Sequence, residues 1–202
     1  MKIGIDIDDT TFLTVKSMLK YADLFEEEIS GVPTNRDSFG LIKNRYYLNA
    51  LYGWDDKTKF DFFNKYYKNV LEECTMLPNA DKVITKLREE GNILHFITAR
   101  LMNIEGCDAE KITKDSLAKF KIPYDYLDLH VRDKVKFFKE KGLDLCIEDS
   151  YETCKEMVDN GIKALLMTTK MNEQISDSEV TRVNNWDQIY QEIKKMENQD
   201  KE

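Results

Sequence analysis

The sequence has no apolar run that approaches the roughly 20 residues a membrane-spanning helix needs. Its N-terminal residues are a short apolar run followed at once by carboxylates, without the longer apolar stretch and cleavage site of a signal peptide. No Cys-x-x-Cys pair occurs, which argues against zinc binding and favours reduced thiols; the cysteines are Cys74, Cys107, Cys146 and Cys154. We therefore expect a cytoplasmic protein that does not bind a membrane.

Positive charge is in deficit, because the 202 residues include 30 Lys and Arg against 38 Asp and Glu, a formal net charge of -8. Binding to a polyphosphate backbone relies on Lys and Arg that displace counterions, so a nucleic acid polymer is a poor candidate partner. A local cation site can still hold a small anionic substrate. With 42% hydrophobic and 34% charged residues, the chain is typical of a globular protein with a buried core, and both a monomer and a homodimer are compatible with it.

Short apolar runs predict the strands of a parallel sheet that is buried on both faces. In chain order they are residues 2–7, 93–97, 143–147 and 163–167, with a weaker run at 126–131 that we expect to be an edge strand. Amphipathic stretches between and after these runs predict helices at residues 81–90, 109–120, 151–160 and 186–196. This alternation favours an α/β fold with helices on both faces of the sheet.

Residues 11–75 interrupt the alternation, because they show no strong strand pattern and carry many aromatic side chains at helical spacing. We interpret this segment as a small helical cap inserted after the first strand. The predicted domains are then an α/β core formed by residues 1–10 and 76–202, and a cap formed by residues 11–75.

Polar residues stand at the ends of three predicted strands. These ends read Asp6-Ile7-Asp8-Asp9-Thr10, Thr98-Ala99-Arg100 and Glu148-Asp149-Ser150. In open α/β sheets, ligands bind beyond the carboxyl ends of the strands. We therefore expect these side chains to converge on one crevice.

The carboxylates at these ends are suited to phosphate ester chemistry. Asp6 and Asp8 are two residues apart, so extended backbone would point both side chains the same way, one as a nucleophile and one as a proton donor. Together with Asp149 they form an acidic cluster that repels itself unless a cation is present, and oxygen ligands of this kind suit Mg²⁺. A carboxylate nucleophile would split hydrolysis into two steps through an aspartyl-phosphate.

A phosphate also needs hydrogen-bond donors and a positive charge. Thr98 offers a hydroxyl, and the backbone amides near Asp9 and Ala99 could complete a cradle at a strand–helix junction. Lys134 and Lys136 both precede the third strong strand, and either could balance the charge. Arg100, in contrast, is interpreted as a structural or rim cation.

In this order, the motifs resemble those of the haloacid dehalogenase (HAD) superfamily. The segment Asp6-Ile7-Asp8-Asp9-Thr10 resembles the first motif, Asp-x-Asp-x-Thr/Val, and Ile97-Thr98-Ala99-Arg100 resembles the second. Lys134 resembles the lysine of the third motif, and Ile147-Glu148-Asp149-Ser150 resembles the acidic fourth motif, so that the agreement spans residues 1–170. The resemblance implies a three-layer Rossmann-like core, a phosphoaspartate mechanism and Mg²⁺.

Roles follow from the resemblance by position. Asp6 would be the nucleophile and a metal ligand, and Asp8 would be the general acid and base, with its backbone carbonyl on the metal. Thr98 and Lys134 would hold the phosphate. The acidic fourth motif would complete the site, with Asp149 on the metal and Glu148, where an Asp often stands, assisting through water.

Within the superfamily, the chain is similar to the 5'(3')-deoxyribonucleotidase branch, also called the cytosolic type C 5'-nucleotidase family. The similarity rests on the short helical cap, on Arg132-Asp133-Lys134 and on the acidic motif ending in Ser150. Members of that branch hydrolyse nucleoside monophosphates with cap aromatics against the base. The candidates here are Phe12, Phe39, Tyr46 and Trp54, although most cap aromatics must form the core of so small a module.

Three functions are therefore compatible with the sequence. The first is a Mg²⁺-dependent phosphatase, a 5'-nucleotidase acting on nucleoside or deoxynucleoside monophosphates. The second is an enzyme with the same core that acts on a sugar phosphate or another small metabolite, as a phosphatase or a phosphomutase. The third is a non-enzymatic phosphate-binding regulatory protein, against which the complete set of carboxylates argues.

Overall fold

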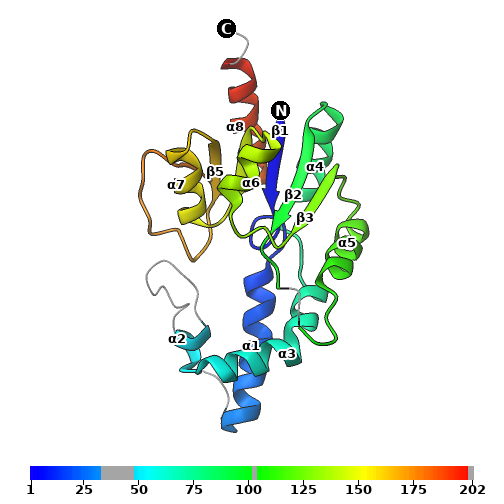
Figure 1. The fold of residues 1–202 in the computed structure, drawn as a ribbon, viewed down its shortest axis with the longest axis vertical. Coiled ribbons are helices and arrows are strands. Elements are labelled where there is room, and N and C mark those ends of the chain that lie inside the picture. The colour runs from blue at the N-terminus through cyan, green and yellow to red at the C-terminus, as the bar shows by residue number, and fades with distance from the viewer. Residues whose placement is uncertain (33–47, 102–103, 200–202) are drawn as a thin grey trace.

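The computed structural model describes residues 1–32, 48–101 and 104–199. Its centre is a six-stranded parallel sheet with the strand order β3-β2-β1-β4-β5-β6 (Figure 1). The strands are β1 (Lys2–Asp6), β2 (Ile93–Thr98), β3 (Tyr126–Leu129), β4 (Leu145–Glu148), β5 (Lys163–Met167) and β6 (Thr181–Val183). The predicted α/β fold with a parallel sheet is confirmed, and β3 is an edge strand as expected. The edge strand β6 was not predicted.

Alternate residues of β1 face opposite sides of the sheet, and each side has a core of its own. Ile3 and Ile5 pack with residues of α4 (Ala80–Glu89), α5 (Ala109–Lys119) and α8 (Trp186–Gln199) on one face. The opposite face is covered by α6 (Lys134–Lys141) and α7 (Tyr151–Asp159), which pack on β4 and β5. Gly4 lies on that side, where an added Cβ would stand 2.2 Å from the Phe138 ring. The glycine therefore lets α6 lie directly on the central strand.

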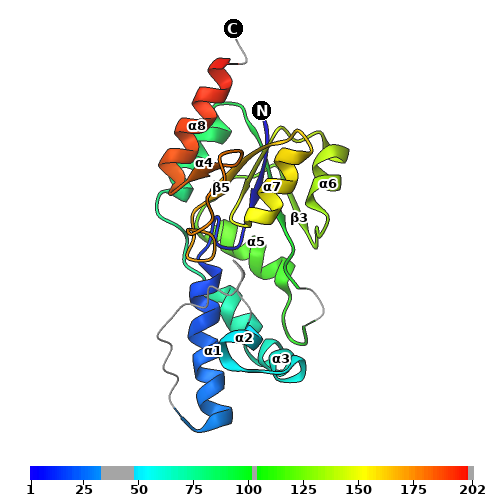
Figure 2. The ribbon, with the colours of Figure 1, turned by 90° about the vertical axis from the view of Figure 1, so that its left-hand side faces the viewer.

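The remaining helices form a layer beyond the carboxyl end of β1 (Figures 1 and 2). They are α1 (Thr14–Ser30), α2 (Leu48–Tyr52) and α3 (Asp56–Glu72), and they share a cluster of their own that includes Phe25, Trp54 and Phe62. These helices lie within the segment predicted to be a cap. Among the described residues, no helix is long and apolar enough to cross a membrane.

The chain enters and leaves the cap through two linkers that pair with each other. The Leu13 N–H donates to the Thr75 carbonyl (2.8 Å), and the Leu77 N–H donates to the Thr11 carbonyl (2.9 Å). On the other side of the cap, Tyr67 and Leu71 of α3 pack with residues of α5 and the loop before it. The cap therefore contacts the core at two places, the paired linkers and the packing of α3 against α5.

Candidate active site

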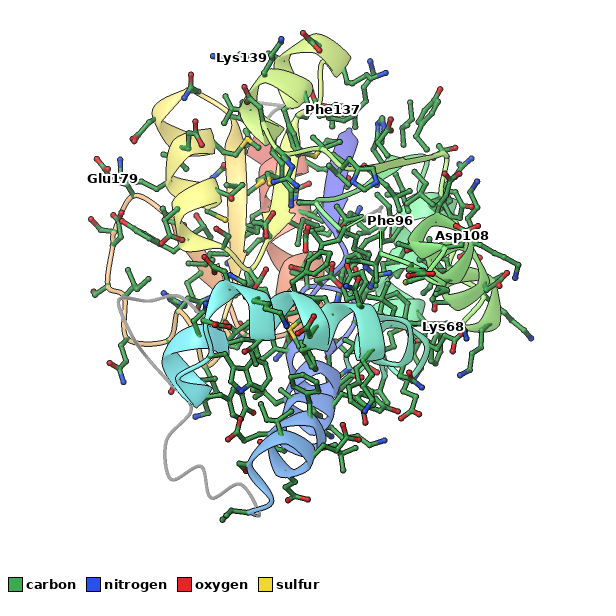
Figure 3. All side chains as sticks on the ribbon, turned by 60° about the horizontal axis from the view of Figure 1, so that its bottom comes forward. Lys68, Phe96, Asp108, Phe137, Lys139 and Glu179 are labelled. Carbon is green, nitrogen blue, oxygen red and sulfur yellow. The ribbon has the colours of Figure 1, made fainter. Side chains whose placement is uncertain are left out.

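The strand order brings the three polar strand ends together, because β1 lies between β2 and β4. They line one cavity of about 600 Å³, whose opposite wall is formed by α1 and α3 of the cap. Figure 3 turns the cap toward the viewer and shows α3 in front of the carboxyl end of the sheet. The predicted site residues that line the cavity are Asp6, Asp8, Asp9, Thr98, Ala99, Lys134, Glu148 and Asp149.

Three carboxylates form the base of the cavity. Asp6, Glu148 and Asp149 each offer an oxygen within 4.8 Å of the other two. Burial raises the pKa of Asp6 well above its usual range, and the charge of Glu148 adds to this, whereas Lys134 opposes it. Burial, Glu148 and Asp9 likewise raise the pKa of Asp149. Such a cluster favours a bound cation, and its oxygen-only donors fit Mg²⁺.

Glu148 lies close enough to the other two carboxylates to share an ion with them. Its carboxylate belongs to the group of oxygens that could hold the ion, and its assistance through water stays a prediction. The Oε1 atom of Glu148 accepts the backbone N–H groups of Asp149 (3.1 Å) and Ser150 (3.2 Å). The turn after β4 therefore fixes the orientation of this carboxylate.

Lys134 joins the cluster, whereas Lys136 does not. The Lys134 ammonium lies 2.5 Å from an Asp6 oxygen and also contacts Glu148. It begins α6, where Asp133 caps the helix by accepting the Lys136 N–H (2.9 Å). The Lys136 side chain is 70% exposed and faces Glu140 on the surface. Of the two lysines left open by the sequence, the structure thus brings Lys134 to the predicted nucleophile.

Asp8 has a different environment from Asp6. The Arg100 guanidinium donates to it through Nε (3.1 Å) and Nη2 (2.8 Å). The hydroxyls of Thr14 (2.5 Å) and Thr98 (3.1 Å) donate as well. Burial raises the pKa of Asp8, but the charge and hydrogen bonds of Arg100 outweigh it, so that the pKa lies below its usual value. Hydrogen bonds from Arg100, Thr14 and Thr98 therefore restrain the Asp8 carboxylate.

Arg100 lies deeper in the site than a rim residue would. Its side chain is only 2% exposed and pairs with Asp8, so of the two interpretations offered by the sequence, a structural or a rim cation, the rim is excluded. The available signal was its position two residues after Thr98, at the end of the same strand. That spacing does not reveal the carboxylate partner Asp8, because Asp8 lies beyond the end of β1 and its position depends on the direction that the chain takes there.

The phosphate cradle is only partly formed by the predicted groups. The Thr98 hydroxyl lies in the cavity, where it accepts the Arg100 N–H (3.2 Å). The Asp9 amide, predicted to face phosphate, donates instead to the Phe12 carbonyl (2.7 Å). The left-handed φ of 55° at Asp9 turns the chain into this tight loop. The Asp9 amide itself is therefore already paired, while Ala99 lines the cavity, and a phosphate cradle formed by the amides near these two residues stays a prediction.

The Asp9 side chain has a separate function at the start of the cap. Both of its oxygens accept the Val15 N–H, at 3.2 and 3.1 Å, in the first turn of α1. Burial raises the pKa of this carboxyl to about 7, with the charge of Asp8 adding to the effect. Asp9 therefore ties the first motif to the cap helix.

The aromatic candidates lie elsewhere than predicted. Phe12 is 1% exposed and packs against Phe120 in the core. Trp54 is buried in the cap cluster, where its indole N–H donates to Glu26 (2.6 Å). Neither lines the cavity, so the structure gives neither the expected place beside a substrate. The other two candidates, Phe39 and Tyr46, lie outside the described residues.

Other cap side chains face the cavity instead. Phe63 and Tyr67 come from one face of α3, and Val15 and Met18 come from α1. The Tyr67 hydroxyl accepts the Leu101 N–H (3.1 Å), which joins the cap to the loop after β2. The spacing of four residues between the two aromatics indicates a shared helix face, but not which face meets the cavity.

The buried side-chain amide of Asn172 is hydrogen-bonded to the backbone of the acidic motif. Asn172 is 2% exposed, and its Nδ2 donates to the carbonyls of Asp149 (2.7 Å) and Met167 (2.8 Å). The Arg182 guanidinium donates to the Oδ1 of Asn172 (2.7 Å). The segment after β5 is thereby attached to the backbone of a candidate metal ligand.

Known proteins resemble this chain over nearly its whole length, although no protein-family profile matches it. A nucleotidase from Clostridium acetobutylicum is 30% identical over 191 residues, which cover 94% of this chain and 92% of that relative. A solved haloacid dehalogenase-like hydrolase from Streptococcus pneumoniae has a TM-score of 0.64 at 15% identity, covering 95% of this chain and 97% of that one. This chain belongs to one family with the clostridial nucleotidase, and it shares its fold with solved haloacid dehalogenase-like hydrolases.

The fold of this protein also recurs in a Thermotoga maritima protein provisionally named a β-phosphoglucomutase. The TM-score is 0.67 at 14% identity, with coverage of 96% of this chain and 99% of that one. At such identity the likeness concerns the fold alone. The predicted HAD-like fold, the resemblance to nucleotidases and the phosphatase class are confirmed, whereas the nucleotide substrate, the magnesium dependence and the residue roles stay predictions.

Proposed function

We propose that this protein is a Mg²⁺-dependent phosphomonoesterase that acts on nucleoside monophosphates through an aspartyl-phosphate. The observation that carries the proposal is the cluster of Asp6, Glu148 and Asp149 around one point, with Lys134 beside it. The nucleotidase name of the clostridial relative supports the substrate class.

The first step uses the two aspartates of the first motif in different roles. An Asp6 oxygen attacks phosphorus, a new O–P bond forms, and the ester O–P bond breaks. Asp8, when it carries a proton, transfers that proton to the departing alkoxide oxygen. The products of the step are the free alcohol and a phosphorylated Asp6.

The second step restores the enzyme. A water molecule attacks phosphorus while Asp8 accepts a proton from it, and the Asp6–phosphorus bond breaks to release inorganic phosphate. Asp6, Glu148 and Asp149 would hold Mg²⁺, which when bound offsets the repulsion between the anionic phosphate and these carboxylates. Lys134 and the Thr98 hydroxyl would contact the phosphoryl oxygens.

The cap wall of the cavity supports a substrate with a flat, partly apolar leaving group. Val15, Met18 and Phe63 present apolar surface, and Lys59 adds a cation on the same wall. A cavity of about 600 Å³ is within the usual range for a small-molecule site. Contact of a base with an aromatic ring contributes about 1–3 kcal/mol. Phe63 is therefore our candidate for that contact in place of Phe12 and Trp54.

A substrate panel tests this function. Hydrolysis of nucleoside monophosphates, sugar phosphates and a small alkyl phosphate is measured with Mg²⁺ and with EDTA. We expect EDTA to abolish turnover and kcat/KM to be highest for nucleoside monophosphates. Phe63→Ala should lower kcat/KM for the nucleotide by roughly 5- to 150-fold and leave the small alkyl phosphate nearly unchanged. As a control, Phe60→Ala removes an exposed aromatic of the same helix.

The other outcomes would identify the alternatives. A preference for sugar phosphates would replace the nucleotidase by a sugar-phosphate phosphatase or phosphomutase. No release of phosphate from any ester, including a reactive aryl phosphate, would leave only a phosphate-binding protein.

A further inference from the structure

The second motif ends in a buried arginine that donates to one carboxylate through two of its three side-chain nitrogens. The Arg100 Nε lies 3.1 Å from each oxygen of Asp8, and Nη2 lies 2.8 Å from Oδ1. The Nη1 group lies 2.7 Å from the Thr113 hydroxyl on α5. Only 2% of the Arg100 side chain is exposed, so its ion pair with Asp8 is not a surface salt bridge.

The Nη1 group of Arg100, which does not contact Asp8, is also held in place by a hydrogen bond. The Thr113 hydroxyl donates to the Ala109 carbonyl (2.6 Å), so its oxygen is left to accept from Arg100. The backbone N–H of Arg100 donates to the Thr98 hydroxyl (3.2 Å). The guanidinium plane is therefore fixed by α5 on one side and by the end of β2 on the other.

This geometry sets the orientation of Asp8 more tightly than a lysine could. A guanidinium is a planar fork that binds a carboxylate through parallel hydrogen bonds, whereas an ammonium is a point charge. The Asp8 side chain is 31% exposed, and it lines the same cavity as Asp6. Its carboxylate is thus presented to the cavity while its rotation is restrained from behind.

We propose that Arg100 is a positioning residue for the reaction, which holds the Asp8 carboxylate in the orientation from which it transfers protons. The inference rests on the proposed function, because it takes Asp8 as the group that protonates the leaving oxygen. Arg100 itself touches neither phosphorus nor the leaving group. Its contribution is to keep Asp8 from occupying other rotamers when a substrate arrives.

The chemistry of the leaving group separates this function from a merely structural one. A nucleoside leaves as a basic alkoxide and needs a proton, whereas p-nitrophenolate departs without one. A misplaced Asp8 therefore slows phosphoryl transfer from the nucleotide much more than from p-nitrophenyl phosphate. General loss of structure would lower both rates by the same factor. Because kcat/KM reports the steps up to the phosphoenzyme, the ratio of the two kcat/KM values isolates the effect.

The experiment compares Arg100→Lys and Thr113→Val with the unaltered protein. General acid catalysis is worth about 10²–10⁴-fold, so Arg100→Lys should lower the nucleotide-to-aryl ratio of kcat/KM by roughly 10-fold or more. Thr113→Val removes only the hydrogen bond to the Nη1 group of Arg100, so it should lower the nucleotide-to-aryl ratio of kcat/KM by a few-fold. Should Arg100→Lys fail to fold, as judged by circular dichroism, the nearly isosteric Thr113→Val carries the test.

The matched control is Ser17→Ala. It removes one buried hydroxyl that donates to the Val70 carbonyl (2.8 Å) in the cap, without contact to Arg100 or Asp8. The ratio should not change in this variant. Equal losses on both substrates in Thr113→Val and Arg100→Lys, or an unchanged ratio, would overturn the positioning role. If the unaltered protein prefers another alkyl phosphate, the proposed substrate fails, and the same ratio is measured with that ester.

Discussion

Replacement of Lys134 by methionine should strongly lower the stability of the metal-free protein, because the acidic cluster loses its positive charge. The Lys134 side chain is 12% exposed, and its ammonium bridges Asp6 (8% exposed side chain) and Glu148 (4%). Removal of one partner from a buried ion pair costs about 3–5 kcal/mol, because the remaining charge is left without compensation. For a chain of this length, each kcal/mol lowers the melting temperature by roughly 2–4 °C. We therefore expect Lys134→Met to melt about 6–20 °C lower in EDTA.

Thermal unfolding followed by circular dichroism measures this effect, with and without excess Mg²⁺. Because the ion would supply the missing positive charge, Mg²⁺ should raise the melting temperature more in Lys134→Met than in the unaltered protein. Lys136→Met is the matched control, since that side chain is 70% exposed and reaches only Glu140 at 3.9 Å. It should leave the melting temperature and the response to Mg²⁺ unchanged.

The loss of stability in Lys134→Met should also depend on pH. Burial raises the pKa of Asp6 in the folded protein, so the native state holds more protons than the unfolded chain at intermediate pH. The free energy of unfolding then falls as pH rises through the interval between the ordinary and the raised pKa. Lys134 lowers the pKa of Asp6, so its removal should raise that pKa further and deepen the loss at pH values above the ordinary carboxyl pKa in EDTA. A variant as stable as the unaltered protein in EDTA across this range would refute the reasoning.

Three further substitutions test separate parts of the account. Asp6→Asn should reduce turnover by roughly ten-thousand-fold or more while keeping the circular dichroism spectrum, and substantial residual hydrolysis would exclude Asp6 as the nucleophile. Asp149→Ala should weaken Mg²⁺ binding measured by calorimetry together with the rate, so a metal titration equal to that of the unaltered protein would remove Asp149 from the ligand set. Gly4→Ala should destabilise the core by about 1–3 kcal/mol in urea, because its Cβ would meet the Phe138 ring at 2.2 Å, and Phe138→Leu should relieve the loss.

The parts of the fold that could be predicted are those marked by a strong apolar pattern in the sequence. Residues 2–7 and 93–97 are continuous apolar runs because both faces of the central strands are covered by helices. The convergence of Asp6, Thr98 and Asp149 followed from the same pattern, since parallel strands end at one edge of the sheet. In contrast, β6 has only three residues at the sheet edge, of which one is fully buried, so it carries no apolar run.

The parts of the site that could not be predicted depend on the direction of individual side chains. A buried ion pair between Arg100 and Asp8 needs the conformation of two loops, which no local spacing reveals. Phe63 and Phe62 are neighbours on α3, yet only Phe63 lines the cavity while Phe62 is fully buried in the cap. Amphipathicity distinguishes apolar from polar faces, but not a face that meets other helices from one that meets a cavity.

Detection of a phosphoryl group on Asp6 tests the proposed mechanism most directly. Asp8→Asn is mixed with p-nitrophenyl phosphate and Mg²⁺, quenched in acid within the first turnover, and mapped by tandem mass spectrometry. Because the aryl group departs without a proton while the attack of water needs Asp8, the phosphoenzyme should accumulate. We predict one phosphoryl group on the peptide that contains Asp6, and none in Asp6→Asn. Phosphorylation at another residue, or release of p-nitrophenol with no covalent phosphate at any time, would contradict it.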